Sequence, residues 1–76
     1  MSDHIYHNTF SSGATITLTV HFFDDKITCE STPVPTGCDR EYKIWRLEVA
    51  NDIVSRSTPQ QLEYLADKVR NHENLF

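Results

Sequence analysis

The sequence predicts a small α+β domain: an antiparallel sheet of three to four strands with one carboxy-terminal helix packed on one of its faces. Apolar and polar side chains alternate with a period of two through residues 14–30, and a capped helical pattern covers residues 58–72. The chain has 76 residues, of which 38 % are hydrophobic and eight are aromatic, which is typical of a folded globule. We therefore expect residues 1–76 to form a single domain.

The first predicted strand covers residues 4–10, where isoleucine, tyrosine, threonine and phenylalanine are concentrated. Ser11, Ser12 and Gly13 follow it and have the composition of a turn. This strand therefore leads directly into the next predicted element.

The second element is a β-hairpin over residues 14–30 with Asp24 and Asp25 as its loop. In this register Val20 lies opposite Cys29 and Phe22 opposite Ile27. One face of the hairpin then carries Ile16, Leu18, Val20, Phe22, Ile27 and Cys29. The other face carries Thr15, Thr17, Thr19, His21, Thr28 and Glu30. A slip of one residue would mix the two sets, so the pattern itself selects the register.

The middle of the chain begins with a predicted loop at residues 31–40, which contain two prolines and a glycine. Residues 41–50 fit a strand, with Trp45, Leu47 and Val49 on one side, and also a helix, with Tyr42, Trp45, Val49 and Ile53 aligned. Aromatic and β-branched residues, and the lack of an acid–base pair four apart within this segment, favour the strand. A turn at residues 51–52 and a short extended piece at 53–56 would follow. In either case Trp45 is expected in the core.

The last predicted element is a helix from Thr58 to about residue 72. Thr58 is its cap, Pro59 occupies the first helical position, and Gln61 completes a capping box. The apolar residues recur at helical spacing and form one stripe, made of Leu62, Leu65, Ala66 and Val69. We expect this stripe to be buried against the apolar face of the hairpin.

The net charge of −4 lies entirely in the first half of the chain. Residues 1–39 contain five acids and one lysine, whereas acids and bases balance in residues 40–76. No lysine or arginine cluster could neutralise phosphates, so no direct nucleic-acid binding is expected. We find no basic-then-apolar leader and no apolar stretch of about 20 residues, which predicts a cytoplasmic protein without a membrane span.

The side chains that could support catalysis or bind a metal do not converge in the predicted fold. Cys29 points to the apolar face, so a free structural thiol is favoured over the alternative of a disulfide with Cys38. His4 and His7, the only close pair of zinc-ligand types, would lie on opposite faces of a strand. Asp24 and Asp25 lie in a solvated turn, and no nucleophile motif or phosphate loop is present. No enzyme activity, cofactor or metal is therefore expected.

Surface recognition is the function left by this elimination. The candidate partner-binding residues are Thr17, Thr19, His21, Asp24, Asp25, Glu30 and Tyr64. The first six lie on or beside the polar face of the hairpin, although solvated threonines on the open face of a two-layer domain are also ordinary. Tyr64 lies off the apolar stripe of the helix, so it is either partly exposed or folded back over a sheet edge.

These residues predict a non-enzymatic module that inhibits or regulates a larger protein with a basic groove. In its format, a single small acidic α+β domain, the chain resembles small phage-encoded inhibitors of host defence, including anti-CRISPR proteins. This resemblance in size and charge implies a nucleic-acid-binding defence complex of the host as the partner. The alternatives are a small homodimeric structural or regulatory protein and a cytosolic thiol or metal-binding protein.

Overall fold

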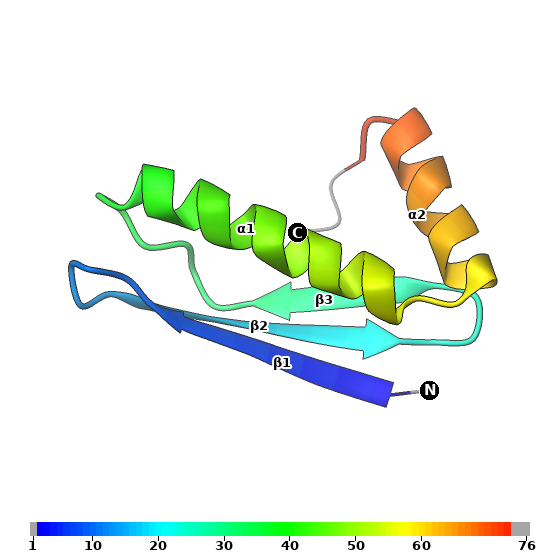
Figure 1. Ribbon diagram of the computed structural model, residues 1–76, viewed down its shortest axis with the longest axis horizontal. Coiled ribbons are helices and arrows are strands. Elements are labelled where there is room, and N and C mark those ends of the chain that lie inside the picture. The colour runs from blue at the N-terminus through cyan, green and yellow to red at the C-terminus, as the bar shows by residue number, and fades with distance from the viewer. Residues whose placement is uncertain (1, 74–76) are drawn as a thin grey trace.

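The computed structural model describes residues 2–73 as a three-stranded antiparallel sheet followed by two helices (Figure 1). The elements are β1 (Ser2–Thr9), β2 (Thr15–Phe22), β3 (Ile27–Ser31), α1 (Asp39–Arg56) and α2 (Pro59–Arg70). The strands lie in the order β1-β2-β3. The α+β class and the antiparallel sheet are confirmed, whereas the prediction of one helix is wrong. Within residues 2–73 no helix is both long and apolar enough to cross a membrane.

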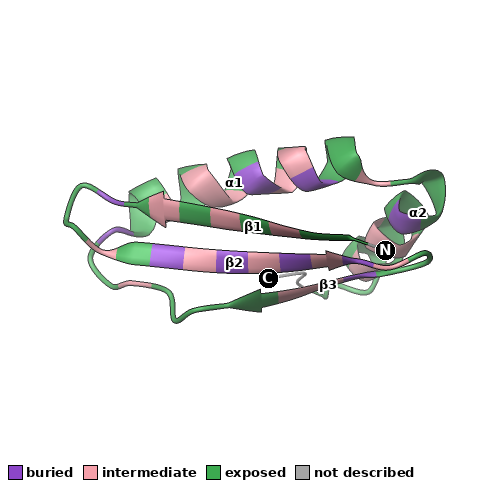
Figure 2. Ribbon diagram, turned by 90° about the horizontal axis from the view of Figure 1, so that it is seen from below, coloured by how far each residue is buried: buried purple, intermediate pink, exposed green. Residues whose placement is uncertain are grey.

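The hairpin of β2 and β3 has the predicted register. Val20 pairs with Cys29 and Phe22 pairs with Ile27. The Phe23 amide donates to the Lys26 carbonyl at 2.9 Å, which leaves Asp24 and Asp25 as the loop. Burial alternates along β2 as this register requires (Figure 2).

β1 begins two residues earlier than predicted and ends at Thr9, so Phe10 leaves the ladder. Phe10 is instead buried with Ile16 and Cys38 in a small cluster at one end of the core. The turn after it is closed by a hydrogen bond of 2.9 Å from the Gly13 amide to the Phe10 carbonyl. Gly13 has a φ of 89°, a left-handed conformation that glycine adopts at little cost.

The prediction of a strand over residues 41–50, with a turn and an extended piece after it, is wrong, because all of these residues belong to α1. Apolar side chains lie on both sides of this helix, which obscures its 3.6-residue period in the sequence. Val49 and Ile53 are buried, while Leu47 and Val54 are exposed. The predicted loop is correspondingly shorter, because β3 extends to Ser31 and α1 begins at Asp39.

α1, and not the carboxy-terminal helix, covers the apolar face of the sheet (Figure 1). The main core cluster consists of Leu18, Val20, Phe22, Ile27, Val49 and Ile53. Trp45 is half-buried and packs against this cluster and against that of Phe10, as expected of a core residue. Burial of each large apolar side chain contributes roughly 1.5–3 kcal/mol, so this layer is the main source of stability.

α2 begins as predicted, but it does not lie across the sheet. The Gln61 amide donates to the Thr58 hydroxyl, and the Gln61 side chain accepts from the Thr58 amide, which completes the capping box. The expected burial of the apolar stripe is wrong: Val69 is 73 % exposed, Leu62 is exposed, and Leu65 packs only partly against the core. α2 lies at the end of the sheet (Figure 1), because α1 already occupies the face that the stripe would cover.

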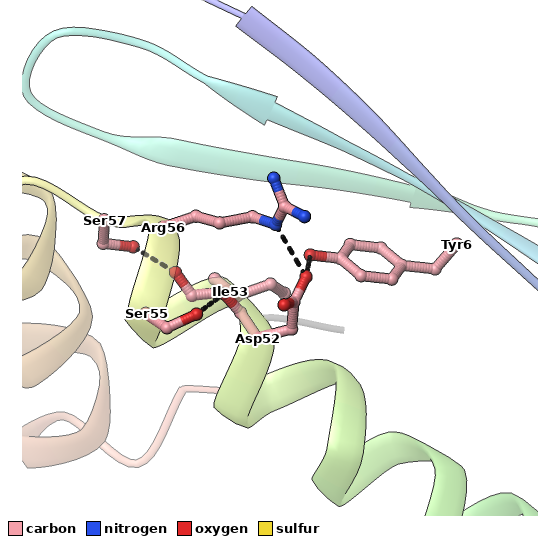
Figure 3. A network of polar contacts seen from close by, with 6 residues as sticks. All are labelled: Tyr6, Asp52, Ile53, Ser55, Arg56 and Ser57. Carbon is pink, nitrogen blue, oxygen red and sulfur yellow. Dashed lines mark hydrogen bonds and ion pairs between the residues drawn. The ribbon is translucent and has the colours of Figure 1, made fainter.

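A polar network holds the edge strand β1 to the end of α1 (Figure 3). The Tyr6 hydroxyl donates to Oδ2 of Asp52 at 2.6 Å, and Nε of Arg56 donates to the same oxygen at 2.7 Å. The two hydrogen bonds lower the pKa of Asp52. Burial, together with the hydrogen bond to Asp52, raises the pKa of Tyr6 to about 12.

Candidate functional site

The face of the sheet away from α1 is covered by neither helix, and we call it the open face. It is formed by Asp3, Ile5, His7 and Thr9 of β1, Thr15, Thr17, Thr19 and His21 of β2, and Thr28 and Glu30 of β3. The structure thus brings together four of the predicted site residues, Thr17, Thr19, His21 and Glu30, on one surface. The contribution of β1 was not predicted.

His21 lies between two carboxylates from the flanking strands. Its Nδ1 is 2.9 Å from Oδ1 of Asp3, and its Nε2 is 3.7 Å from Oε2 of Glu30. The hydrogen bond with Asp3 raises the pKa of His21 most, desolvation opposes it, and the negative charges of Asp3 and Glu30 raise the pKa further. The His21 ring can therefore carry a positive charge that partly neutralises the carboxylates of Asp3 and Glu30.

Ile5 is the apolar residue at the middle of the open face. It pairs with Thr19, which pairs with Glu30 on its other side, and its side chain is 64 % exposed. In the next row Nδ1 of His7 lies 2.9 Å from the Thr17 hydroxyl. An exposed isoleucine surrounded by threonines and histidines is the arrangement of a small apolar anchor with a polar border.

Three of the five acids in residues 1–39, Asp3, Asp24 and Asp25, gather at one end of the sheet, which we call the acidic end, and Glu30 lies in the next row of the open face, level with Ile5. Antiparallel pairing places Asp3 beside His21, close to the β2–β3 turn that contains Asp24 and Asp25, and Glu30 follows on β3. Asp39 lies apart, at the start of α1. An open polar depression of about 780 Å³ at this end is lined by Asp3, Asp24 and Arg56 among others. The two carboxylates, against one guanidinium, favour the entry of a lysine or arginine side chain.

Tyr64 does not belong to this surface, because it lies on α2. Its side chain is half-buried, which agrees with the expectation of a partly exposed tyrosine. Nζ of Lys68 lies 5.1 Å from the centre of its ring. Phe23, by contrast, borders the open face: its ring centre is 6.4 Å from that of His21, and Lys26 lies over it at 5.1 Å.

The sequence missed Asp3 and Ile5 because both depend on how β1 pairs with β2. Alternation along β1 is weak, since the inward positions hold His4, Tyr6 and Asn8 in place of aliphatic residues. The signal that could have identified them is the position of Gly13, which sets the turn and therefore the register of the first two strands.

The cysteines and histidines form no metal site in the described part of the chain: no group of three His, Cys, Asp or Glu side chains there could hold an ion. Cys29 and Cys38 are free thiols. Burial raises the pKa of Cys29 to about 11, so its thiol is protonated near neutral pH.

The candidate site is thus a surface, made of the open face and the acidic end, and its function has to be inferred from its own chemistry. Comparison of the chain with protein-family models, with curated proteins and with solved structures found no match.

Proposed function

We propose that the protein is a non-enzymatic binding module that docks its open face and acidic end on a basic surface of a larger protein. The observation that supports this most directly is the gathering of Asp3, Asp24, Asp25 and Glu30 beside a sheet face that neither helix covers. Complementary charge chiefly accelerates association, while an apolar contact at the centre of the face slows dissociation. Ile5 is the residue placed to make that contact.

Occupation of the basic surface would inhibit or regulate the partner. A groove that normally binds nucleic acid is a natural target, because its lysines and arginines are already arranged to face negative charge. The small acidic format of the chain, like that of phage-encoded inhibitors of host defence, agrees with such a role. A nucleic-acid-binding defence complex is therefore the first class of partner to test.

The test is to isolate the partner by affinity capture and then to measure binding kinetics with purified proteins. Asp24→Asn, Asp25→Asn and Glu30→Gln should each slow association and leave the melting temperature nearly unchanged, because these side chains are exposed. Asp39→Asn is the matched control, since it removes an exposed carboxylate that lies at the start of α1, apart from the acidic end. Binding should also weaken between about 50 and 500 mM salt, as the Debye length falls from about 14 to 4 Å.

The contribution of Ile5 is tested separately through dissociation. Ile5→Thr should raise the dissociation rate, whereas Val34→Thr, at an exposed position in the loop before α1, should not. Binding that is independent of salt and of all these substitutions would contradict the proposal. A tight homodimer in light scattering, disrupted by Ile5→Thr, would instead support the alternative of a homodimeric structural or regulatory protein.

A further inference from the structure

A second surface lies between α1 and α2 and has a different chemistry from the open face. It is a groove of about 570 Å³ whose apolar lining includes Leu47, Ile53, Val54, Leu65 and Val69. Ile53 belongs to the core, but Leu47 is 67 % and Val69 73 % exposed. The groove joins these side chains into one apolar strip, and such strips on small proteins commonly mark binding sites.

The groove exists because α1 is apolar on both sides. Trp45 and Val49 pack toward the sheet, and Leu47, between them in the sequence, is left on the side away from it. α2 does not cover Leu47, because it is anchored at the end of the sheet by its first turn. The strip therefore faces away from the open face, on the opposite layer of the molecule.

The charges around the groove are mostly positive. Its lining contains three basic residues, Lys43, Arg46 and Lys68, and one acidic residue, Glu73. Lys68 and Glu73 form an ion pair with an N–O distance of 3.8 Å, whereas Lys43 makes no ion pair within residues 2–73. The groove thus has the opposite charge to the acidic end.

We propose that this groove binds an amphipathic helix of a partner protein whose apolar face is flanked by aspartate and glutamate side chains. Helix-in-groove binding needs an apolar strip contacted by residues one turn apart, which Leu47, Val54 and Val69 provide. The surrounding cations select acidic flanks. A second copy docked groove to groove would bring Lys43, Arg46 and Lys68 of both chains together, and a bare anion would leave the apolar lining in water. The proposal does not depend on the function of the open face.

The probes are two fluorescent helical peptides of about 18 residues with the same leucine face, one flanked by glutamates and the other by lysines. Fluorescence anisotropy with the full chain should give a Kd at least about tenfold lower for the glutamate peptide. Leu47→Gln and Val69→Gln should each weaken that binding about tenfold or more. Ile44→Gln is the matched control, because Ile44 is an exposed apolar residue of α1 that does not line the groove, and it should leave the Kd unchanged.

The charge selection is tested with Lys43→Gln, which should bring the two peptides closer in affinity, against Arg40→Gln outside the groove. Equal binding of both peptides, binding of neither, or no effect of Leu47→Gln and Val69→Gln would overturn the proposal. Binding only by a chain shortened to end at Glu73 would make residues 74–76 the occupant, and a dimer that Leu47→Gln dissociates would make a second copy the occupant. Either result would overturn it as well.

Discussion

Gln61 is a buried polar residue that joins the start of α2 to the residue after β2. Its side chain is 5 % exposed, accepts a hydrogen bond from the Thr58 amide at 2.8 Å, and donates through Nε2 to the Phe23 carbonyl at 2.6 Å. The capping box alone needs only an acceptor, which glutamate would supply equally well. The contact with Phe23 needs a donor, so glutamine is the residue that satisfies both neighbours.

Gln61→Glu should therefore destabilise the fold although it preserves the capping box. The carboxylate would lose the donated bond and face the Phe23 carbonyl in a buried place, at a cost of about 1–3 kcal/mol. Urea denaturation measures the loss, with Gln60→Glu at the neighbouring exposed position as the control, expected within about 0.5 kcal/mol. Equal effects of the two variants would show that the contact with Phe23 contributes nothing.

Tyr6 gives a second prediction at the residue scale. Its pKa of about 12 implies an ionisation that appears in the ultraviolet spectrum only at strongly alkaline pH and that is absent from Tyr6→Phe. Because the neutral hydroxyl is the form stabilised in the fold, its contribution to stability is lost as the pH rises from 10 through about 12. Asp52→Asn should move the ionisation to lower pH, since it removes the charge that opposes the phenolate. An unchanged titration in Asp52→Asn would leave burial as the whole cause.

At the scale of elements, the two sides of α1 have different roles. Its inner side seals the core, and its outer side forms most of the apolar groove. α2 is held to the sheet by the bond from Gln61 in its first turn to Phe23 and by the partial packing of Leu65. The two helices should therefore contribute unequally to stability.

Two adjacent residues of α1 test the difference between its inner and outer sides. Ile53→Ala should lower the free energy of unfolding by about 2–5 kcal/mol, because it leaves a cavity in the core. Val54→Ala should change it by less than about 1 kcal/mol, since the side chain is half in solvent on the outer side. Thermal or urea unfolding of the pair makes the comparison. A loss at Val54 as large as that at Ile53 would mean that the outer side of α1 is packed in solution.

For the whole molecule, titratable pairs shape the dependence of stability on pH. The raised pKa of His21 contributes stability that is fully present below its usual value of 6.5 and is lost as the pH rises through the folded-state pKa. The lowered pKa values of Asp52 and of Glu41, which accepts hydrogen bonds from Ser11, contribute stability above 3.8 and 4.5 that is lost as the pH falls through their folded-state values.

The free energy of unfolding should therefore be highest at mildly acidic pH. Denaturation across the pH range should show a fall on both sides, and His21→Gln should flatten the part of the fall that begins near pH 6.5 while leaving the acid side in place. Asp52→Asn should weaken the fall on the acid side and leave the fall that depends on His21 in place. A profile of His21→Gln identical to that of the parent chain would mean that Asp3 and Glu30 do not hold the charged ring in solution.

Local rules determined the elements that the sequence predicted correctly. The hairpin register follows from side-chain alternation around Asp24 and Asp25, and the start of α2 follows from Thr58 and Gln61, which lie within one helical turn. The open face over β2 and β3 follows from the same register, which is why Thr17, Thr19, His21 and Glu30 were placed together. The sequence did not place Asp3 and Ile5 on this face, because their positions depend on the pairing of β1 with β2.

Only the tertiary structure decided which helix covers the sheet. The apolar stripe of α2 and the inner side of α1 are both suited to the apolar face of the sheet. A sheet of three strands has room for only one helix on that face. α1 takes it with Trp45, Val49 and Ile53, and the stripe of α2 is left largely exposed. The sequence by itself therefore determined the hairpin, the helix cap and the acidic half of the chain. Which helix covers the apolar face depends on contacts between residues distant in the sequence, which no local pattern contains. Those contacts determine which side chains form the core and which line the groove.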